Sequence, residues 1–178
     1  MTGTMTGTMT GMTRRGATAA LAAGSGMGAT RVSAAPTLLT MRDIVKEGDS
    51  ACVYHCDFGD ARRFSQMLDN ARNHLEAYEF NPLALQLVIV AHAAGIRFFL
   101  NDLAGTPWAA DPVEGDVIKR MAALGGHGVR GYLCATTFAK NNIPQDRARP
   151  EAWLRMVPSG VAMVGALQTK GFAYVKIG

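Results

Sequence analysis

Residues 51–96 read "ACVYHCDFGDARRFSQMLDNARNHLEAYEFNPLALQLVIVAHAAGI", and this stretch decides the fold. Two short apolar segments, "ACVYHC" and "LQLVIVA", flank a longer segment with helical periodicity. In that longer segment the apolar side chains fall on one stripe and the charged side chains outside it, as in an amphipathic helix. The order strand, helix, strand predicts parallel strands with a helix packed on the sheet.

The same pattern continues toward the C-terminus. Two further strand candidates, "VRGYLCA" and "FAYVKI", and a weaker one, "WLRMV", alternate with helix-like stretches at "IRFFLN", "DPVEGDVIKRMAAL" and "PSGVAMVGALQTK". Alternating strands and helices predict a three-layer α/β/α domain with a mostly parallel sheet. A chain of 178 residues is long enough for one such domain.

The first 34 residues predict an export signal. A "MTGT" repeat is followed by Arg14 and Arg15, a weakly apolar Ala/Gly/Thr stretch, and a small-residue cleavage site at 32–34. The mild hydrophobicity and Arg31 favour the twin-arginine route, so we expect a periplasmic protein. The alternative is a misplaced start codon followed by a disordered basic tail. Residues 35–50 are then an N-terminal extension, and residues 51–178 are the domain.

Most of the net positive charge belongs to this leader. Of 18 basic residues, removal of the three leader arginines leaves 15, which face 14 acidic residues. The body has no Lys/Arg stripe with interleaved aromatics, so we expect no nucleic-acid binding. We also expect no stable membrane anchor, because even "LALQLVIVAHAAGI" is interrupted by Gln86 and His92.

The body contains three cysteines, Cys52, Cys56 and Cys134. In an oxidising compartment cysteines tend to pair, and an odd number leaves at least one thiol over. Cys52 and Cys56 lie four residues apart in one predicted strand, so their Cα atoms are about 13 Å apart, beyond the roughly 7 Å limit for a disulfide. We therefore expect no bridge between these two.

Polar residues follow several of the predicted strands. In a parallel sheet the carboxyl ends of all strands lie at one edge, and ligands bind in crevices there. The residues expected at this edge are Cys56, Asp57, His92, Cys134, Thr136, Thr137, Ser159 and Gly160. The sequence therefore predicts one shared site built from these side chains.

Cys134 is the candidate nucleophile of that site. It lies where an apolar strand meets a turn into a short helix-like segment, whose N-terminus favours a thiolate. His92, one strand over, would act as a base or a hydrogen-bond donor. The alternative is that Cys134 is a small core residue, because cysteine is among the most buried residue types. Cys52 and His55, inside the first strand, are expected to be structural.

Neither a metal nor a cofactor is expected. The chain contains no CxxC, HxxxH or HExxH spacing, which argues against a metal site built from His55, His92 and Cys134. The glycine-rich "GGHG" precedes a strand instead of following one, so it does not form a phosphate loop. The "VPSGV" segment around Ser159 does not match the nucleophile elbow of serine hydrolases.

The segments "VYHCDFGDARRFSQMLDNARNHLEAY", "LQLVIVAHAAGI", "GVRGYLCATTFAKNNI" and "MVPSGVAMVGALQTKGFAYVKI" together resemble the DsrE/DsrF-like family, in the same order along the chain. The resemblance implies a five-stranded parallel sheet in three layers, homo-oligomers such as trimers or hexamers, and a link to sulfur metabolism. It also implies sulfur carried as a persulfide on one cysteine. Cys134 matches that cysteine, and His92 matches the histidine of a "VAHG" segment, with Ala93 in place of glycine.

Two functions follow. The first is an exported sulfur carrier or sulfurtransferase with Cys134 as the acceptor, working with donor and acceptor proteins or small sulfane-sulfur compounds. Export would distinguish this chain from the well-understood sulfur carriers of the family, which are cytoplasmic. The second is a non-catalytic oligomeric module that binds a small ligand or serves as a scaffold. Its motivation is the long loop "NDLAGTPWAADPVEG", whose Trp108 would cover a pocket or a subunit interface.

Overall fold

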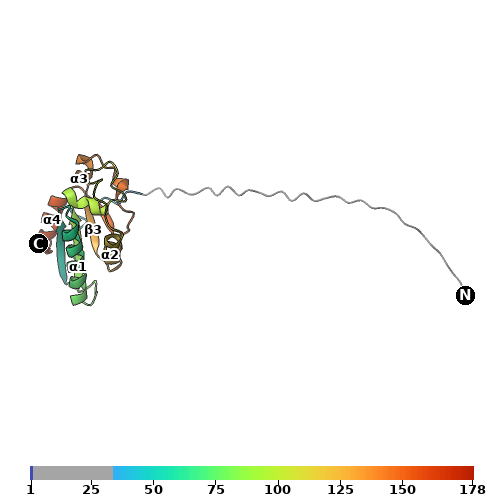
Figure 1. Cartoon of the computed structure of the whole chain (residues 1–178). Coiled ribbons are helices and arrows are strands. Elements are labelled where there is room, and N and C mark those ends of the chain that lie inside the picture. The colour runs from blue at the N-terminus through green and yellow to red at the C-terminus, as the bar shows by residue number, and fades with distance from the viewer. Residues whose placement is uncertain (2–33) are drawn as a thin grey trace. The chain divides into compact units, whose positions relative to one another are not determined.

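The computed structural model describes Met1 and residues 34–178, and it contains one five-stranded sheet (Figure 1). The strands are β1 (Ser50–Cys56), β2 (Leu85–Ala91), β3 (Arg130–Cys134), β4 (Leu154–Val157) and β5 (Ala173–Val175). The helices are α1 (Ala61–Ala77), α2 (Gly115–Gly126), α3 (Ala135–Lys140) and α4 (Gly160–Thr169), with 3₁₀ turns η1 (Ala93–Phe99) and η2 (Gln145–Arg147). The strand order is β4-β3-β2-β1-β5, and all neighbouring pairs are parallel.

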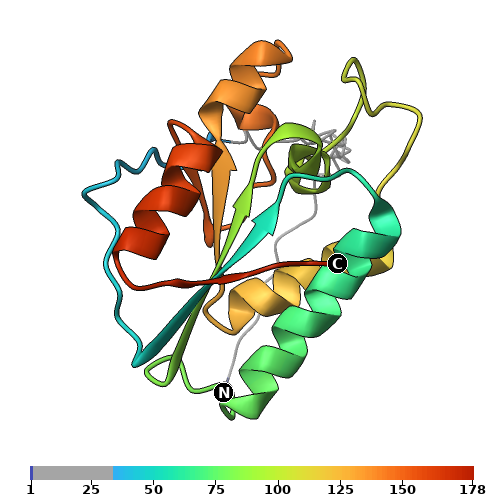
Figure 2. The same ribbon diagram turned by 90° about the vertical axis from the view of Figure 1, so that its left-hand side faces the viewer.

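Helices cover both faces of this sheet, which confirms the predicted three-layer α/β/α fold. Figure 2 shows α4 on one side of the strands and α1 with α2 on the other. All seven residues of β2 are buried, as expected for a strand near the middle of a sheet that is covered on both faces.

The face under α1 and α2 holds the larger core. Asp60 caps α1 by accepting a hydrogen bond from the Arg63 backbone N–H at 2.7 Å. The apolar stripe of α1 then packs inward, and the ring of Phe64 stacks on the ring of Phe98 in η1 with centroids 3.8 Å apart. The amphipathic pattern of α1 thus fixes which face of the sheet it covers.

The opposite face is covered by α4, and its position depends on two features of the sequence. Ser159 caps the helix, its hydroxyl accepting from the Ala162 N–H. Met163 and Leu167 are fully buried and join a core that includes Val53 and Val90 of the sheet. Because α4 starts directly after β4, its first turn lies at the carboxyl edge of the strands.

The N-terminal extension belongs to the folded domain. Leu38 forms a parallel bridge with Met156, the Leu39 N–H donates to the Met156 carbonyl at 2.8 Å, and Ile44 is 2 % exposed in the core under α4. Gln86 is buried in β2, and its side chain bonds the backbone of Glu47 and Val45. The extension is therefore held by pairing, apolar burial and hydrogen bonds.

The predicted export signal, with Arg14, Arg15 and Arg31, lies outside the described residues. Within residues 34–178 no helix has the length and apolar character needed to cross a membrane.

Candidate functional site

The strand register brings three side chains to one face of the sheet: those of His92 and Cys134, which were predicted at the site, and that of His55, which was not. His55 pairs with Val90, and Ala91 pairs with Leu133, so His92 and Cys134 occupy the next row at the carboxyl edge. Side chains alternate between faces along a strand. His55, His92 and Cys134 therefore share the α4 face with Val53 and Val90, on three adjacent strands.

A cavity of about 290 Å³ opens at this edge. Five of the predicted site residues line it, namely His92, Cys134, Thr136, Thr137 and Ser159. Lys140 lines it as well and supplies a cationic group. The structure thus gathers most of the residues that were expected at the edge, from the ends of β2, β3 and β4.

Hydrogen bonds of two threonines join the chain segments that line the cavity. The Thr137 hydroxyl accepts a hydrogen bond from the Ala93 N–H at 3.0 Å, which joins α3 to the segment after β2. The Thr136 hydroxyl donates to the Pro158 carbonyl at 2.8 Å, which joins α3 to the segment after β4. Cys134 lies between these two hydrogen bonds as the last residue of β3, and it is 5 % exposed.

Cys56, which we expected at the same pocket, lies elsewhere. It is fully buried in the core under α1 and α2, because its place in β1 turns its side chain to the face opposite His55. Burial raises the pKa of the Cys56 thiol well above its usual value, and it also raises the pKa of Cys52. All three cysteines are free thiols, and of these only Cys134 borders the cavity.

Gly160 does not line the cavity but determines the space for His92. A Cβ atom on Gly160 would lie 2.8 Å from the His92 Cβ, closer than such atoms approach in proteins, and 3.0 Å from its Cδ2, which is a very tight contact. The first residue of α4 therefore has to be small for the imidazole to keep its position.

Ala93 adopts a left-handed backbone conformation with φ of 48°. This is the position at which the family resemblance implies glycine, and the conformation explains that preference, since a left-handed residue with a Cβ costs roughly 1–2 kcal/mol. The hydrogen bond from the Ala93 N–H to the Thr137 hydroxyl helps stabilise Ala93 in this strained conformation.

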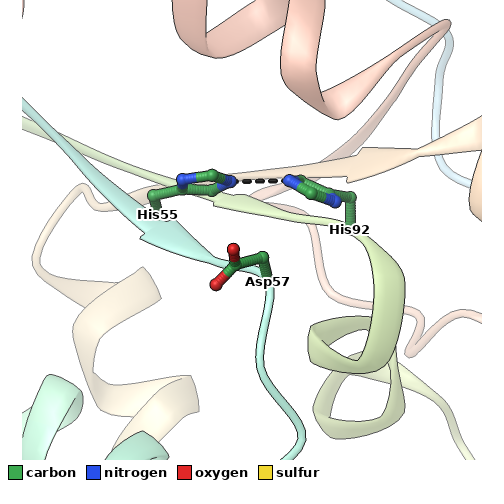
Figure 3. Close-up of side chains that lie close together, drawn as sticks. All are labelled: His55, Asp57 and His92. Carbon is green, nitrogen blue, oxygen red and sulfur yellow. Dashed lines mark hydrogen bonds between the residues drawn. The ribbon is translucent and has the colours of Figure 1, made fainter. Parts of the chain in front are cut away.

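His55 faces His92 across the two strands (Figure 3). The two Nε2 atoms are 2.6 Å apart, and the Nδ1 of His55 lies 3.1 Å from the hydroxyl oxygen of Tyr174 in β5. Asp57, exposed just after β1, completes a cluster in which one ligand atom per residue lies within 4.8 Å of the others. From its position inside a predicted strand, His55 was expected to be structural. The signal that would have found it is its position on the same face as His92, one strand away.

Burial lowers the pKa values of both imidazoles at this cluster. The proximity of His55 lowers the His92 pKa further, while the Asp57 carboxylate acts on both rings in the opposite direction. The two rings are therefore neutral near pH 7 and keep unshared electron pairs on nitrogen. Of the predicted site residues, His92 and Asp57 are the ones whose side chains, together with His55, could hold a metal ion.

Other features of the surface do not compete with this site. A larger cavity, of about 770 Å³, lies between α1 and α2, and three of its charged groups are paired with one another, with Arg120 bonded to Asp69 at 2.6 Å and 3.7 Å from Asp116. It contains neither cysteine nor histidine. Trp108 is half-buried against the core of its own domain and does not border the smaller cavity.

The fold and the site define a parallel α/β domain with a thiol-lined cavity at the carboxyl edge of its strands. Residues 55–177 match the model of the DsrE/DsrF-like family, and the chain belongs to this family. Membership supports a role related to sulfur metabolism at the level of the family.

One solved structure with a similar fold is that of a protein of unknown function, MTH1491, from Methanobacterium thermoautotrophicum. The two share 24% sequence identity with a TM-score of 0.56, and the match covers 71% of this chain and 98% of that chain. This likeness supports the fold alone. No curated protein matches the sequence.

Proposed function

We propose that the protein is an exported sulfur carrier or sulfurtransferase that holds sulfur as a persulfide on Cys134. The observation that carries this proposal is the contrast among the three thiols. Cys134 borders a cavity with polar side chains, whereas Cys52 and Cys56 lie in the core. A sulfur acceptor has to meet its donor, and Cys134 is the one of the three thiols that lines this cavity.

The chemistry is a thiol exchange in which atoms and charge balance. The Cys134 thiol loses its proton to solvent, and the thiolate attacks the outer sulfur of a donor R–S–SH. A new sulfur–sulfur bond forms on Cys134, the donor's own sulfur–sulfur bond breaks, and R–S⁻ leaves with the electron pair. A thiolate of an acceptor protein then attacks the outer sulfur of the Cys134 persulfide and restores the thiolate.

The cavity walls suit an anionic sulfur donor. Lys140 contributes a positive charge at the rim, and His92 and Ser159 contribute polar groups from the neighbouring strand ends. Polysulfide and thiosulfate are small anions of the kind that such a lining accommodates. Their sulfane sulfur is also the atom that a thiolate attacks.

The test is intact-mass spectrometry of the full chain after anaerobic exposure to polysulfide or thiosulfate, with single Cys→Ser variants at positions 52, 56 and 134. A gain of roughly 32 Da per added sulfur that disappears only in Cys134→Ser supports the persulfide. No gain with either donor, or a gain that persists in Cys134→Ser, contradicts it.

A second candidate is the non-catalytic ligand-binding module, which is favoured by the low 5 % exposure of Cys134. A small anion held by Lys140 and the threonines would need no covalent step. Thermal stabilisation by such an anion that persists in Cys134→Ser, together with the absence of sulfur loading, would support this function over the first.

Self-association and export complete the proposal. A second copy of the chain would cover apolar side chains on the α4 side, where Val161 is 67 % exposed and Tyr174 45 % exposed. Sedimentation velocity of the full chain measures this association, and a monomer at micromolar concentration would contradict it. Export is supported by the paired arginines, and replacing Arg14 and Arg15 by lysine should keep the protein out of the periplasmic fraction.

A further inference from the structure

The cluster of His55, Asp57 and His92 lies beside the cavity of Cys134 and is separate from the chemistry proposed for the thiol. Two imidazole nitrogens and one carboxylate oxygen converge at the carboxyl edge of β1 and β2, all within 4.8 Å of one another (Figure 3). His92 is shared with the cavity, while His55 and Asp57 do not line it.

The contact between the two rings needs either a proton, as in an N–H···N hydrogen bond between neutral rings, or a metal cation between the nitrogens. At 2.6 Å the Nε2 atoms are closer than the roughly 2.9 Å usual for an N–H hydrogen bond. Two unshared electron pairs facing each other at this distance repel. The contact becomes attractive when either a proton or a metal cation lies between the nitrogens.

A hydrogen bond from the Nδ1 of His55 to Tyr174 leaves the Nε2 of His55 free to bind a metal ion. The Nδ1 of His55 lies 3.1 Å from the Tyr174 hydroxyl, to which an Nδ1–H can donate. In that tautomer Nε2 carries the electron pair and points at His92. A metal-binding histidine is usually held in this way, with its other ring nitrogen bonded to an outer partner.

The backbone positions of both histidines are fixed. His55 lies within β1, and the His92 N–H donates to the Cys56 carbonyl at 3.0 Å, which continues the pairing of β1 with β2. Gly160 packs against the His92 side chain from α4. Ligands on rigid strands hold a site more accurately than ligands on loops.

We propose that His55, Asp57 and His92 bind a divalent first-row transition metal ion, with Zn²⁺ as the best match. Imidazole nitrogen is a preferred ligand of such ions, whereas Ca²⁺ and Mg²⁺ take oxygen ligands. Three protein ligands leave a fourth position of the tetrahedron to water or a small anion.

The adjustment required for binding is small. Ligand atoms about 2.1 Å from Zn²⁺ at tetrahedral angles are about 3.4 Å from one another. The two Nε2 atoms must move apart by about 0.8 Å, and the Asp57 oxygen, at most 4.8 Å from the nitrogens, must move in by up to about 1.4 Å. Asp57 is exposed, so its side chain is free to turn.

The experiment uses the full chain, freed of metal with a chelator and titrated with Co²⁺ and then Zn²⁺. We expect one equivalent of Co²⁺ to give visible ligand-field absorption without a thiolate charge-transfer band, and Zn²⁺ to abolish it. His55→Gln and Asp57→Asn should weaken binding at least about 10-fold, and Tyr174→Phe about 10-fold.

His74→Gln is the matched control. His74 is also half-buried and bonded to a tyrosine, with its Nδ1 3.1 Å from the Tyr54 hydroxyl, but it lies outside the cluster. His74→Gln and Cys134→Ser should both bind metal as the wild type does, which also separates this site from the persulfide. Asp57→Asn changes only an exposed side chain, so its loss of binding cannot reflect unfolding. An absence of stoichiometric uptake, or uptake unaffected by His55→Gln and Asp57→Asn, overturns the proposal.

Discussion

Replacing Gly160 by alanine tests whether the first turn of α4 sets the position of His92. The new Cβ would lie 2.8, 3.0 and 3.1 Å from the Cβ, Cδ2 and Cγ atoms of His92. The ring cannot retreat without breaking its 2.6 Å contact with His55. Overpacking of this kind costs about 1–3 kcal/mol, and the lower chain entropy of unfolded alanine returns about 0.4–1 kcal/mol. We expect Gly160→Ala to lower the free energy of unfolding by about 1–2 kcal/mol.

Gly165 offers a matched control in the same helix. No atom lies within 4 Å of a Cβ placed there, so the substitution meets no clash. Gly165→Ala should raise the free energy of unfolding by up to about 1 kcal/mol through helix propensity. Opposite signs for the same substitution in one helix would separate the local contact from any general effect of alanine.

Urea unfolding followed by circular dichroism measures both effects, and a double-mutant cycle identifies the clashing partner. His92→Gly removes all three contacting atoms, and its own backbone entropy cancels within the cycle. In that background Gly160→Ala should lose most of its penalty, giving a coupling energy of about 1–2 kcal/mol. A coupling below about 0.5 kcal/mol would refute the assignment of the clash to His92.

Three further predictions concern single residues. Ala93→Gly should raise the free energy of unfolding by up to about 1 kcal/mol in urea, because relief of the left-handed strain exceeds the entropy gained by the unfolded chain; a decrease would contradict the strain. Alkylation of the native protein should label Cys134 before Cys56, as peptide mass spectrometry would show, and equal rates would contradict the cavity. Burial lowers the His74 pKa, so the unfolded state takes up its proton first and stability falls as pH drops below the unfolded value of about 6.5. His74→Gln should reduce this loss in urea titrations at pH 7 and pH 5, and an unchanged pH dependence would count against the shift.

The layers of the fold could be predicted from the sequence because the strands and helices differ in periodicity. The segment "LQLVIVA" is apolar throughout, and it is β2, with all seven residues buried. The weak candidate "WLRMV" is confirmed as β4, although Arg155 interrupts its apolar pattern. The segment "FAYVKI" gives only the short β5, because this strand lies at the exposed edge of the sheet and pairs on one side.

The site was predicted less completely, because side-chain direction depends on register. The ends of the strands place Cys134 and His92 at one edge without further knowledge. Predicting the contact between His55 and His92 requires knowledge that β1 lies next to β2. Placing Cys56 requires knowledge of which residues at the end of β1 face each side of the sheet. Neither is encoded in local periodicity. The pairing of residues 37–39 with β4 joins segments more than a hundred residues apart, which local patterns also do not report.

That pairing determines where the sheet is open to other strands. Leu38 and its neighbours occupy the outer backbone groups of β4, so an incoming chain cannot add to the sheet there. Within the described residues, β5 pairs with β1 alone and is only three residues long. Cleavage after Ala34 would leave the pairing at β4 in place, so a chain processed at this position would keep that edge protected against aggregation, with strand exchange limited to β5.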